Sequence, residues 1–423
     1  MKKTKTKIKG SVLAFTTFVL IAITIIISTI FLQAGIITYY QANVIVESNV
    51  ITDINIGINY VLYSLNSNQN SDVDLVDLLN DPLNPVITHS SRWGFLQIVG
   101  AKKRTAKRTI EKNGFVGFKN TTENNYSLYL VDAGSPLSLC GSTRIKGNAY
   151  LPLQGVKKGY LGNNPYNGDK LVYGNILKSN STMPDVFRNT IDSINNYFNI
   201  SLISMPKVFI SIGDADNNFF NSFNNHTKII YDESPIHLSN FICRGNYLIE
   251  SVTSVSLDST VKIEDVIIKA PYIEILEGFK GTVQCIASDS IFIDKNCHLI
   301  YPSVLSIIVQ PQSDGFKSMV ISDSSTIEGL LFVAATNQTK ETTLLTLKGG
   351  ATIIGQVFCN GLFEAKGKVI GNTVCRRTIL FTPSSVHNNH LLNAKFITNT
   401  NNHFLNILPG IINKGRKDII KWI

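Results

Sequence analysis

The sequence predicts a mainly β protein with one N-terminal membrane helix. Two observations lead to this fold class: an uncharged apolar stretch follows a short lysine-rich start, and a short motif recurs at regular spacing in the second half. Only 16% of the residues are charged and β-branched residues recur throughout, which favours strands over helical bundles. We expect a transmembrane α-helix extended by an amphipathic helix, then a right-handed parallel β-helix (solenoid) with an inserted α/β segment.

Residues 1–10 form a basic leader. The excess of Lys+Arg over Asp+Glu is 39 − 30 = 9, and five of these nine charges precede the apolar stretch. They are Lys2, Lys3, Lys5, Lys7 and Lys9. The basic balance therefore indicates membrane topology, and we expect no nucleic-acid partner.

Residues 11–38 are expected to be the transmembrane helix, whose partner is membrane lipid. No charged residue occurs from Gly10 to Val46, and roughly 20 residues suffice to cross the hydrocarbon. The preceding lysines place the N-terminus in the cytoplasm. This predicts a single-pass protein of the inner (cytoplasmic) membrane with a periplasmic or surface-exposed body. A cleaved secretory signal is the alternative, but the apolar run is too long and Gln33-Ala34-Gly35 is a poor cleavage site.

Residues 39–70 are expected to continue the helix in amphipathic form. Apolar side chains recur at helical spacing in this segment. They are Ile51, Ile54, Ile58, Val61 and Leu65. Charged Glu47 precedes them and Asp53 lies among them, and the polar run that begins at Asn66 marks the end of the helix. One continuous helix is therefore predicted to run from the membrane into the body.

The start of the chain resembles a known family. Lys9-Gly10-Ser11, followed by a long apolar-to-amphipathic helix, is similar to the N-terminus of type IV pilins and of pseudopilins over about the first 65 residues. The resemblance implies a leader peptidase that cleaves after Gly10, leaving Ser11 as the first residue, and other pilin-like subunits as partners. Phe15 stands where most members have a Glu thought to pair with a neighbouring subunit's N-terminal amine. This departure implies a position at a filament tip or outside a filament. An uncleaved signal anchor is the alternative.

An internal repeat predicts the body. Copies have an apolar first position, a small or polar turn, and mostly apolar or small residues four and six positions later. They start at Leu257, Ile275, Ile293, Ile321, Leu347 and Phe363, the first three being 18 residues apart. Such a period suits one turn of a parallel β-helix, which we expect over residues 236–395. The register predicts burial of Ile263, Leu299, Ile327, Ile353 and Val369. A β-sandwich is the alternative.

The remaining segments are assigned around this repeat. A further copy, Leu139 to Gly147, suggests that residues 71–150 hold a lead-in region and the first solenoid strands. Residues 151–235 are expected to be an insertion that contains a helix, and residues 396–423 a basic C-terminal tail. This layout is similar to envelope proteins of the Bacteroidota. That likeness implies a compartment and a shape, and no activity.

Few residues suggest chemistry. Six cysteines show no C-x-x-C and no zinc spacing, so we expect small buried side chains, with one disulfide as the alternative. They are Cys140, Cys243, Cys285, Cys297, Cys359 and Cys375. Asp214 and Asp216 start a calcium-like loop, but Phe219 occupies its glycine position, which favours a solvated turn. His387 and His390 lack a third ligand and are interpreted as a surface loop.

The acids of the repeat region are scattered over turns, whereas a polysaccharide lyase or hydrolase needs clustered acids. We therefore expect no catalytic residue, no cofactor, no metal and no small-molecule substrate. The sequence predicts a non-catalytic membrane-anchored cell-envelope protein, a structural or assembly component of a pilin-like surface or secretion system. The alternative is a tethered β-helix that binds or cleaves polysaccharide.

Overall fold

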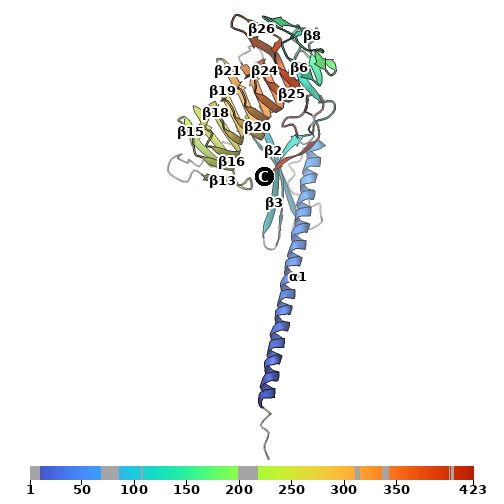
Figure 1. The fold of residues 1–423 in the computed structure, drawn as a ribbon, viewed down its shortest axis with the longest axis vertical. Coiled ribbons are helices and arrows are strands. Elements are labelled where there is room, and N and C mark those ends of the chain that lie inside the picture. Colours follow the sequence, from blue (N-terminus) through green and yellow to red (C-terminus); the bar gives the residue numbers. More distant parts are fainter. Residues whose placement is uncertain are drawn as a thin grey trace, which may run out of the picture. The chain divides into compact units, whose positions relative to one another are not determined.

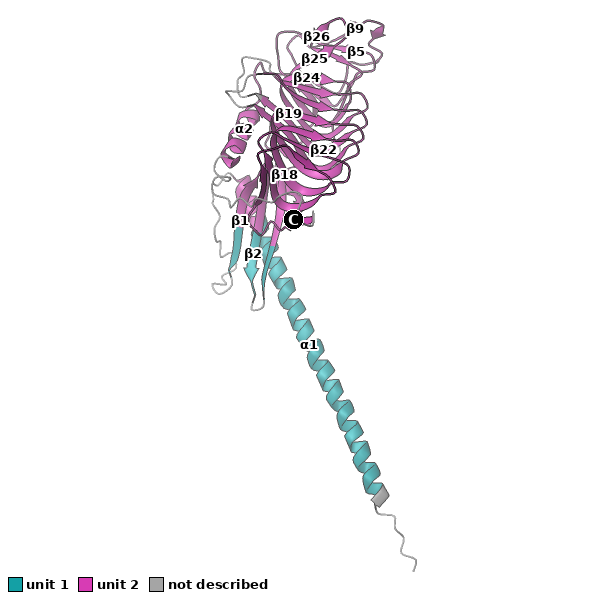
Figure 2. Ribbon diagram, turned by 90° about the vertical axis from the view of Figure 1, so that its left-hand side faces the viewer, with its two compact units in different colours: residues 1–59, 75–88, 101–111 teal, residues 60–74, 89–100, 112–423 magenta. Residues whose placement is uncertain are grey.

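The computed structural model describes residues 10–67, 85–105, 108–198, 218–309, 315–335, 343–399, 401 and 404–423. The chain begins with helix α1 (Gly10–Asn66), and the rest is mainly β, as Figure 1 shows. It divides into two compact units (Figure 2). Unit 1 comprises Met1–Asn59, Leu75–Thr88 and Ala101–Glu111, and unit 2 the remainder.

The first half of α1 is apolar and exposed. Leu13, Phe15 and Phe31 are 69%, 68% and 74% exposed, and the helix is long and apolar enough to cross a membrane. The two expected segments, 11–38 and 39–70, form one continuous helix that ends at Asn66. A single N-terminal helix suited to membrane anchoring is therefore confirmed. The leader, residues 1–9, and residues 68–84 lie outside the described residues.

The second half of α1 buries one stripe of side chains. Val50, Ile54 and Ile58 are buried, whereas Ile51 is 47% exposed. The buried stripe therefore starts at Val50 and not at Ile51. Val50, Ile54 and Ile58 are four residues apart and share one helix face, whereas Ile51 lies about 100° from Val50 around the helix axis.

Within unit 1 this half of α1 packs on strands β1 (Val86–Trp93) and β2 (Leu96–Arg104). A Cβ on Gly57 would lie 2.8 Å from Val86 Cγ1, so only glycine permits this close approach. Lys103 Nζ lies 2.9 Å from Asp53 Oδ2 at the same contact. The amphipathic half of the helix is therefore held by the first strands of the body.

A small sheet has the order β1-β2-β3-β29, with β3 spanning Thr109–Phe118 and β29 spanning Lys417–Trp422. β29 pairs antiparallel with β3. The segment 396–423, expected as a basic tail, thus ends in a strand, because its apolar residues continue this sheet. Lys421 Nζ is held by Asp265 Oδ2 at 2.7 Å and Glu264 Oε1 at 3.0 Å.

A second sheet of 20 strands is built mainly from parallel pairs, and we call it the parallel stack. Its long members are β16 (Ile242–Ser251), β18 (Lys262–Ile275), β19 (Lys280–Ile293), β20 (His298–Val309), β22 (Thr326–Ala335), β24 (Thr352–Ala365) and β25 (Lys368–Phe381). Shorter members between them include β15 (Ile236–Leu238), β17 (Ser254–Leu257), β21 (Lys317–Ile321) and β23 (Thr343–Leu347). Figure 1 shows these strands side by side.

The repeat copies lie in register in this stack. Leu257 pairs with Ile275, Ile275 with Ile293, and Ile293 with Ile321. Leu299 pairs with Ile327, Ile327 with Ile353, and Ile353 with Val369. The five positions predicted to be buried are all at most 3% exposed. The parallel register predicted by the repeat is thus confirmed, except at the first position of the last copy.

The first position of the last copy is two residues out of register, although Val369 of the same copy stays aligned with Ile353. Leu347 pairs with Ala365, whereas the motif aligns it with Phe363. The turn from Ala365 to Val369 is correspondingly tighter. A Cβ on Gly367 in this turn would lie 2.5 Å from the Ala351 carbonyl oxygen, so glycine makes the short turn feasible.

The order of stacking differs from the order of the sequence. Strand β6 (Arg144–Lys146) pairs with β28 (Lys395–Ile397), and β4 (Tyr126–Leu130) pairs with β25. The upstream repeat copy therefore follows the last downstream strand in space, as the green strands beside the red ones in Figure 1 show. The order of the strands along the sequence does not predict that β6 pairs with β28.

Residues 151–235 are only partly an insertion. Strands β11 (Val172–Tyr173) and β12 (Ile176–Lys178) extend one end of the stack by pairing with β6 and β7 (Asn148–Leu151). Strands β13 (Asn218–Asn221) and β14 (Lys228–Asp232) extend the other end by pairing with β16. Helix α2 (Val186–Asn196) lies between these strands in sequence, as predicted for this segment.

Two apolar cores stabilise unit 2. One is formed by the inward side chains of the parallel stack. The other lies on the outer side of the middle strands, where Phe332 stacks on Phe187 of α2 with ring centroids 4.7 Å apart and meets Phe95 at 5.4 Å. One face of the stack is therefore covered by α2 and by the β1–β2 hairpin.

Candidate functional site

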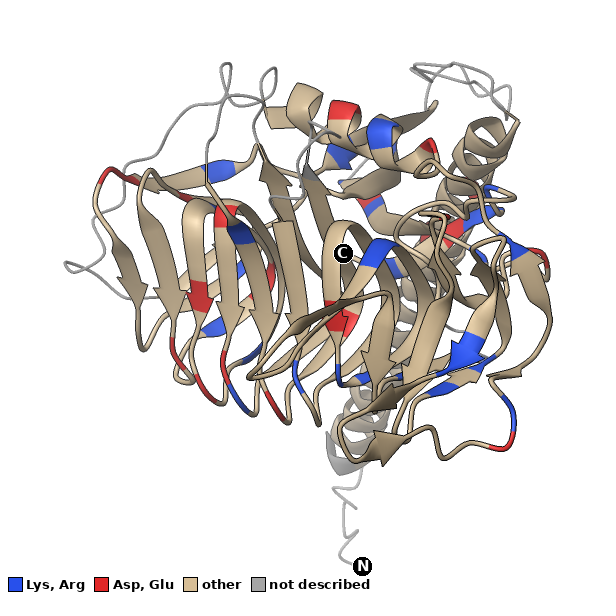
Figure 3. Cartoon of the chain, turned by 90° about the horizontal axis from the view of Figure 1, so that it is seen from above, with Lys and Arg blue, Asp and Glu red and all other residues tan. Residues whose placement is uncertain are grey.

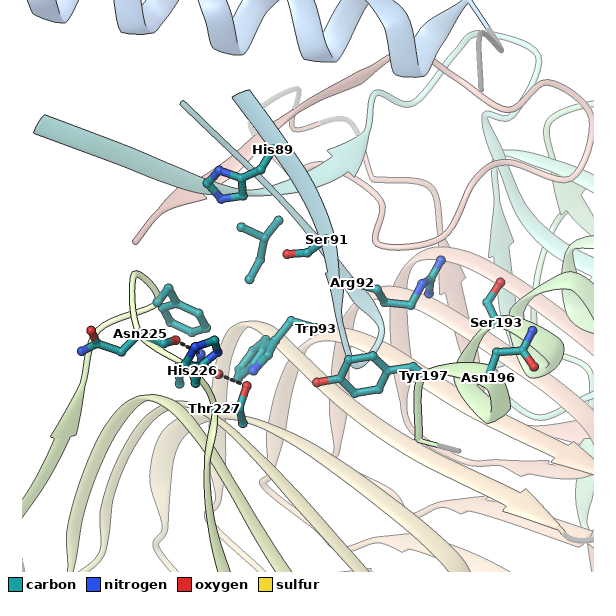
Figure 4. Close-up of a pocket in the computed structure, with 13 residues that line it drawn as sticks. His89, Ser91, Arg92, Trp93, Ser193, Asn196, Tyr197, Asn225, His226 and Thr227 are labelled. Carbon is teal, nitrogen blue, oxygen red and sulfur yellow. Dashed lines mark hydrogen bonds between the residues drawn. The ribbon is translucent and has the colours of Figure 1, made fainter. Parts of the chain in front are cut away.

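Unit 2 contains a cavity with a volume of about 650 Å³. It is formed by the β1–β2 hairpin, the end of α2, and the loop after β13 (Figure 4). Its lining residues are His89, Ser91, Arg92, Trp93, Ile98, Ser193, Asn196, Tyr197, Phe223, Asn225, His226, Thr227 and Asn246. This volume is within the range of about 300 to 1,000 Å³ that is usual for small-molecule sites.

The hairpin wall is fixed by a buried amide. The Phe95 N–H donates to Gln284 Oε1 at 2.8 Å, and Gln284 Nε2 donates to the Trp93 carbonyl at 3.1 Å. The Trp93 ring stacks on Phe115 at 5.2 Å and meets the edge of Phe223 at 5.0 Å. Phe115 and Phe223 also meet each other at 5.3 Å, so the three rings form one cluster, and the buried Trp93 contributes structure more than ligand contact.

The loop wall is also held by side-chain amides. Asn221 Nδ2 donates to the His226 carbonyl at 2.9 Å and to the Asn246 carbonyl at 2.8 Å. The Thr227 hydroxyl donates to Asn246 Oδ1 at 2.8 Å, and Asn246 Nδ2 donates to the Asn225 carbonyl at 2.9 Å. These bonds fix the loop and leave the exposed side chains of Asn225 and His226 at the cavity (Figure 4).

The third wall is the end of α2, with Ser193, Asn196 and Tyr197 (Figure 4). Burial raises the pKa of Tyr197 to about 12, an effect that a hydrogen bond from the Gly94 N–H opposes. Tyr197 is therefore a neutral phenol at physiological pH. It supplies no base to the cavity.

The charge of the cavity is positive. Desolvation lowers the pKa of Arg92, although a guanidinium remains a cation at neutral pH. Burial lowers the pKa of Lys417, and repulsion from Arg92 adds to the effect. The described residues lining the cavity include no Asp or Glu. The cavity therefore suits a neutral or anionic polar ligand and lacks the carboxylates that glycoside hydrolysis or calcium binding requires.

The expected cleavage site lies at the start of α1. Helix α1 begins at Gly10, and Lys9 lies outside the described residues. Cleavage after Gly10 stays a prediction.

The cysteines are buried, as predicted, and all six are free thiols. Burial raises the pKa of Cys359 to about 12, and it raises the pKa of Cys285 and Cys375 as well. Raised thiol pKa values disfavour the nucleophilic thiolate. These side chains therefore pack the interior, and no disulfide joins them in this structure.

The two histidines lie close together. The rings of His387 and His390 are 5.4 Å apart, but His387 Nε2 meets Ser385 Oγ at 2.7 Å and His390 Nδ1 meets the Asn388 carbonyl at 2.7 Å. Within the described ranges no group of three or more His, Cys, Asp or Glu is placed to hold a metal ion. Asp214 and Asp216 lie outside those ranges, while Phe219 is half-buried on β13 against Phe241.

The scattered acids were Asp258, Glu264, Asp265, Glu274, Glu277, Asp289 and Asp294. Several are used in structural contacts: Asp265 and Glu264 bind Lys421, and Asp289 binds Lys317. Burial raises the pKa of Asp265, an effect that Lys421 opposes. None of these acids lines the cavity.

The residues of the cavity come from four separated stretches of sequence, and no spaced motif joins them. Sequence reasoning therefore missed this site. No protein-family model, curated protein or solved structure matches the chain. The function must be argued from the molecule itself.

Proposed function

We propose that the protein is a non-catalytic, membrane-anchored component of the cell envelope that works as a structural or assembly subunit of a pilin-like system. In this proposal, the first half of α1 lies in the inner membrane, the N-terminus is cytoplasmic, and the body is periplasmic or surface-exposed. The observation that carries the proposal is α1 itself, one helix from Gly10 to Asn66.

The two halves of α1 have different partners. The apolar side chains from Leu13 to Phe31 are left exposed by the residues that the structure describes, so they need lipid or the helices of other subunits. Residues Asp53 to Ile58 are instead held by β1 and β2 through the close contact at Gly57. A helix fixed to its body at one end and bare at the other suits lateral packing among membrane helices. This supports the resemblance to pilins and pseudopilins.

We also infer that the parallel stack is a right-handed parallel β-helix. Support comes from strands such as β18, β19 and β24, each of which pairs with its neighbours along two or three successive segments. Glycines with positive φ repeat at one corner, where Gly355 pairs with Gly329 and Gly371 with Gly355. Such a rod is a suitable spacer or docking surface.

The absence of catalysis is part of the proposal. Buried thiols with raised pKa values, ion-paired acids and a cavity lined without carboxylates all support a binding or scaffolding role. The alternative function, binding of polysaccharide by a tethered β-helix, is favoured by the positive cavity with its amide and hydroxyl groups. Nothing in the cavity favours cleavage.

The mature N-terminus tests the pilin-like assignment. Native protein purified from its own membrane should begin at Ser11 by mass spectrometry, and Gly10→Trp should block that processing. Gly35→Trp is a matched control, because Gly35 lies in the same helix and a Cβ there would meet nothing within 4 Å. A working protein that retains Met1 or Lys2 would contradict the assignment and leave a plain signal anchor.

A further inference from the structure

One outer face of the parallel stack carries a column of cations. Lys368 pairs with Lys395, and Lys395 pairs with Arg144, so the three lie on successive strands β25, β28 and β6. Their neighbours Val369, Phe396 and Ile145 are buried, and alternation along a strand therefore points the three cations outward. We call Lys368, Lys395 and Arg144 the cation column.

The column is assembled only by the fold. Arg144 is far from Lys368 in sequence, and the two approach because the upstream strand β6 stacks behind β28. Lys146 lies two residues beyond Arg144 and is also exposed. Arg144 lies over the Tyr173 ring at 5.5 Å, a cation–π contact that orients its guanidinium.

These cations have no acidic partner in the part of the chain that the structure describes. Among the described residues, no ion pair involves any member of the cation column. Further along the same face, by contrast, His298 meets Glu328 at 3.1 Å and Arg244 lies 4.0 Å from Glu264. Figure 3 shows Lys and Arg on neighbouring strands at one end of the stack, and mixed charges along the turns at the other.

An unpaired column of this kind opposes stability. Neighbouring strands are about 4.8 Å apart, and like charges directly opposite each other are destabilising. The free protein therefore has a surface whose repulsion an anion would relieve. The three cations lie in one line, and each is one strand away from the next. A linear anion with repeated charges would therefore contact all three at once.

We propose that the cation column binds a linear acidic polysaccharide that runs along the parallel stack, with successive carboxylates facing successive strands. Arg144 offers a bidentate contact to one carboxylate, and the lysines offer point charges. The adjacent outward row contains half-buried Ile370 and Ile397, which pair with each other and present an apolar strip to the C–H faces of sugar rings. The choice of polysaccharide over nucleic acid rests on the proposed location of the body outside the cytoplasm.

Binding is tested on the full chain in a non-ionic detergent with fluorescein-labelled polygalacturonate, and labelled dextran serves as the neutral polymer. Lys395→Glu should bind polygalacturonate at least about fivefold more weakly, since it removes one contact and adds repulsion. Lys228→Glu is the matched control: it makes the same charge change at an exposed position on β14, at the other end of the stack. It should bind like the unmodified protein, and dextran should not bind.

A second readout separates ligand binding from a merely structural role. Lys395→Gln should weaken polygalacturonate binding and, without ligand, should raise the denaturant midpoint, because repulsion from Lys368 and Arg144 is relieved. Equal losses of binding in Lys395→Glu and Lys228→Glu, or no loss in either, would overturn the proposal. Binding to phosphatidylglycerol vesicles that depends on Lys395, with no polygalacturonate binding, would replace the polysaccharide by a lipid surface and also overturn it. These measurements do not depend on the mature N-terminus, so failure of the pilin-like assignment is a separate result.

Discussion

Replacing Ile353 by Asp tests the register of the parallel stack. Ile353 is fully buried between Ile327 and Val369 on the neighbouring strands. Truncation to Ala should cost about 2 to 5 kcal/mol in the free energy of unfolding. The Asp adds an unpaired buried charge, worth roughly another 3 kcal/mol or more. The sum is comparable to the whole stability of a typical domain, about 5 to 15 kcal/mol.

The matched control is Ile354→Asp, one residue along the same strand. Ile354 is half-buried and points to the other side, so its replacement should cost far less. Urea titration followed by the fluorescence of Trp93 and Trp422, the two tryptophans of the chain, measures both variants against the unmodified protein. If Ile354→Asp were as damaging as Ile353→Asp, the inward and outward assignments of β24 would be refuted.

Four further predictions use other parts of the molecule. Gly355→Ala should lower the midpoint strongly, because φ is +137° and a Cβ would lie 2.0 Å from the Gly329 carbonyl oxygen; an unchanged urea midpoint would contradict this. Burial raises the pKa of Asp265 above 3.8, so the folded chain binds a proton that the unfolded chain has lost, and stability falls as pH rises through that window. Asp265→Asn should flatten this dependence in urea titrations at several pH values. Deleting residues 401–423 should destabilise the body, because β29 and buried Ile407 and Leu408 are lost; an unchanged midpoint would show that the segment is dispensable. A reporter fused after Ile423 should be active only outside the cytoplasm, and cytoplasmic activity would refute the topology.

The repeat allowed the register to be predicted because inward positions of a stack must be apolar in every copy. Leu299, Ile327 and Ile353 are therefore recognisable in the sequence and do stack. The order of stacking was not predictable, because β6 meets β28 through backbone hydrogen bonds, which every residue type except proline can make. The cavity escaped prediction for a related reason. Asn221, Asn246 and Gln284 are ordinary polar residues in the sequence, and their roles depend on carbonyl and N–H groups that only the fold brings near.

The covered face of the stack did leave a signal in the sequence. Along β18 the first and last segments alternate between buried and exposed, whereas Val266, Ile267 and Ile268 are buried in succession. The same holds for Val304 to Val309 on β20. A strand buried on both sides reads as a continuous apolar run, and an alternating strand has one side in water. The runs therefore mark the face that α2 and the hairpin cover, and the alternating segments mark faces that stay open. Lys395 and Arg144 lie on alternating segments, so the column that they form with Lys368 stays open to a polymer, whereas α2 and the hairpin occupy the covered face.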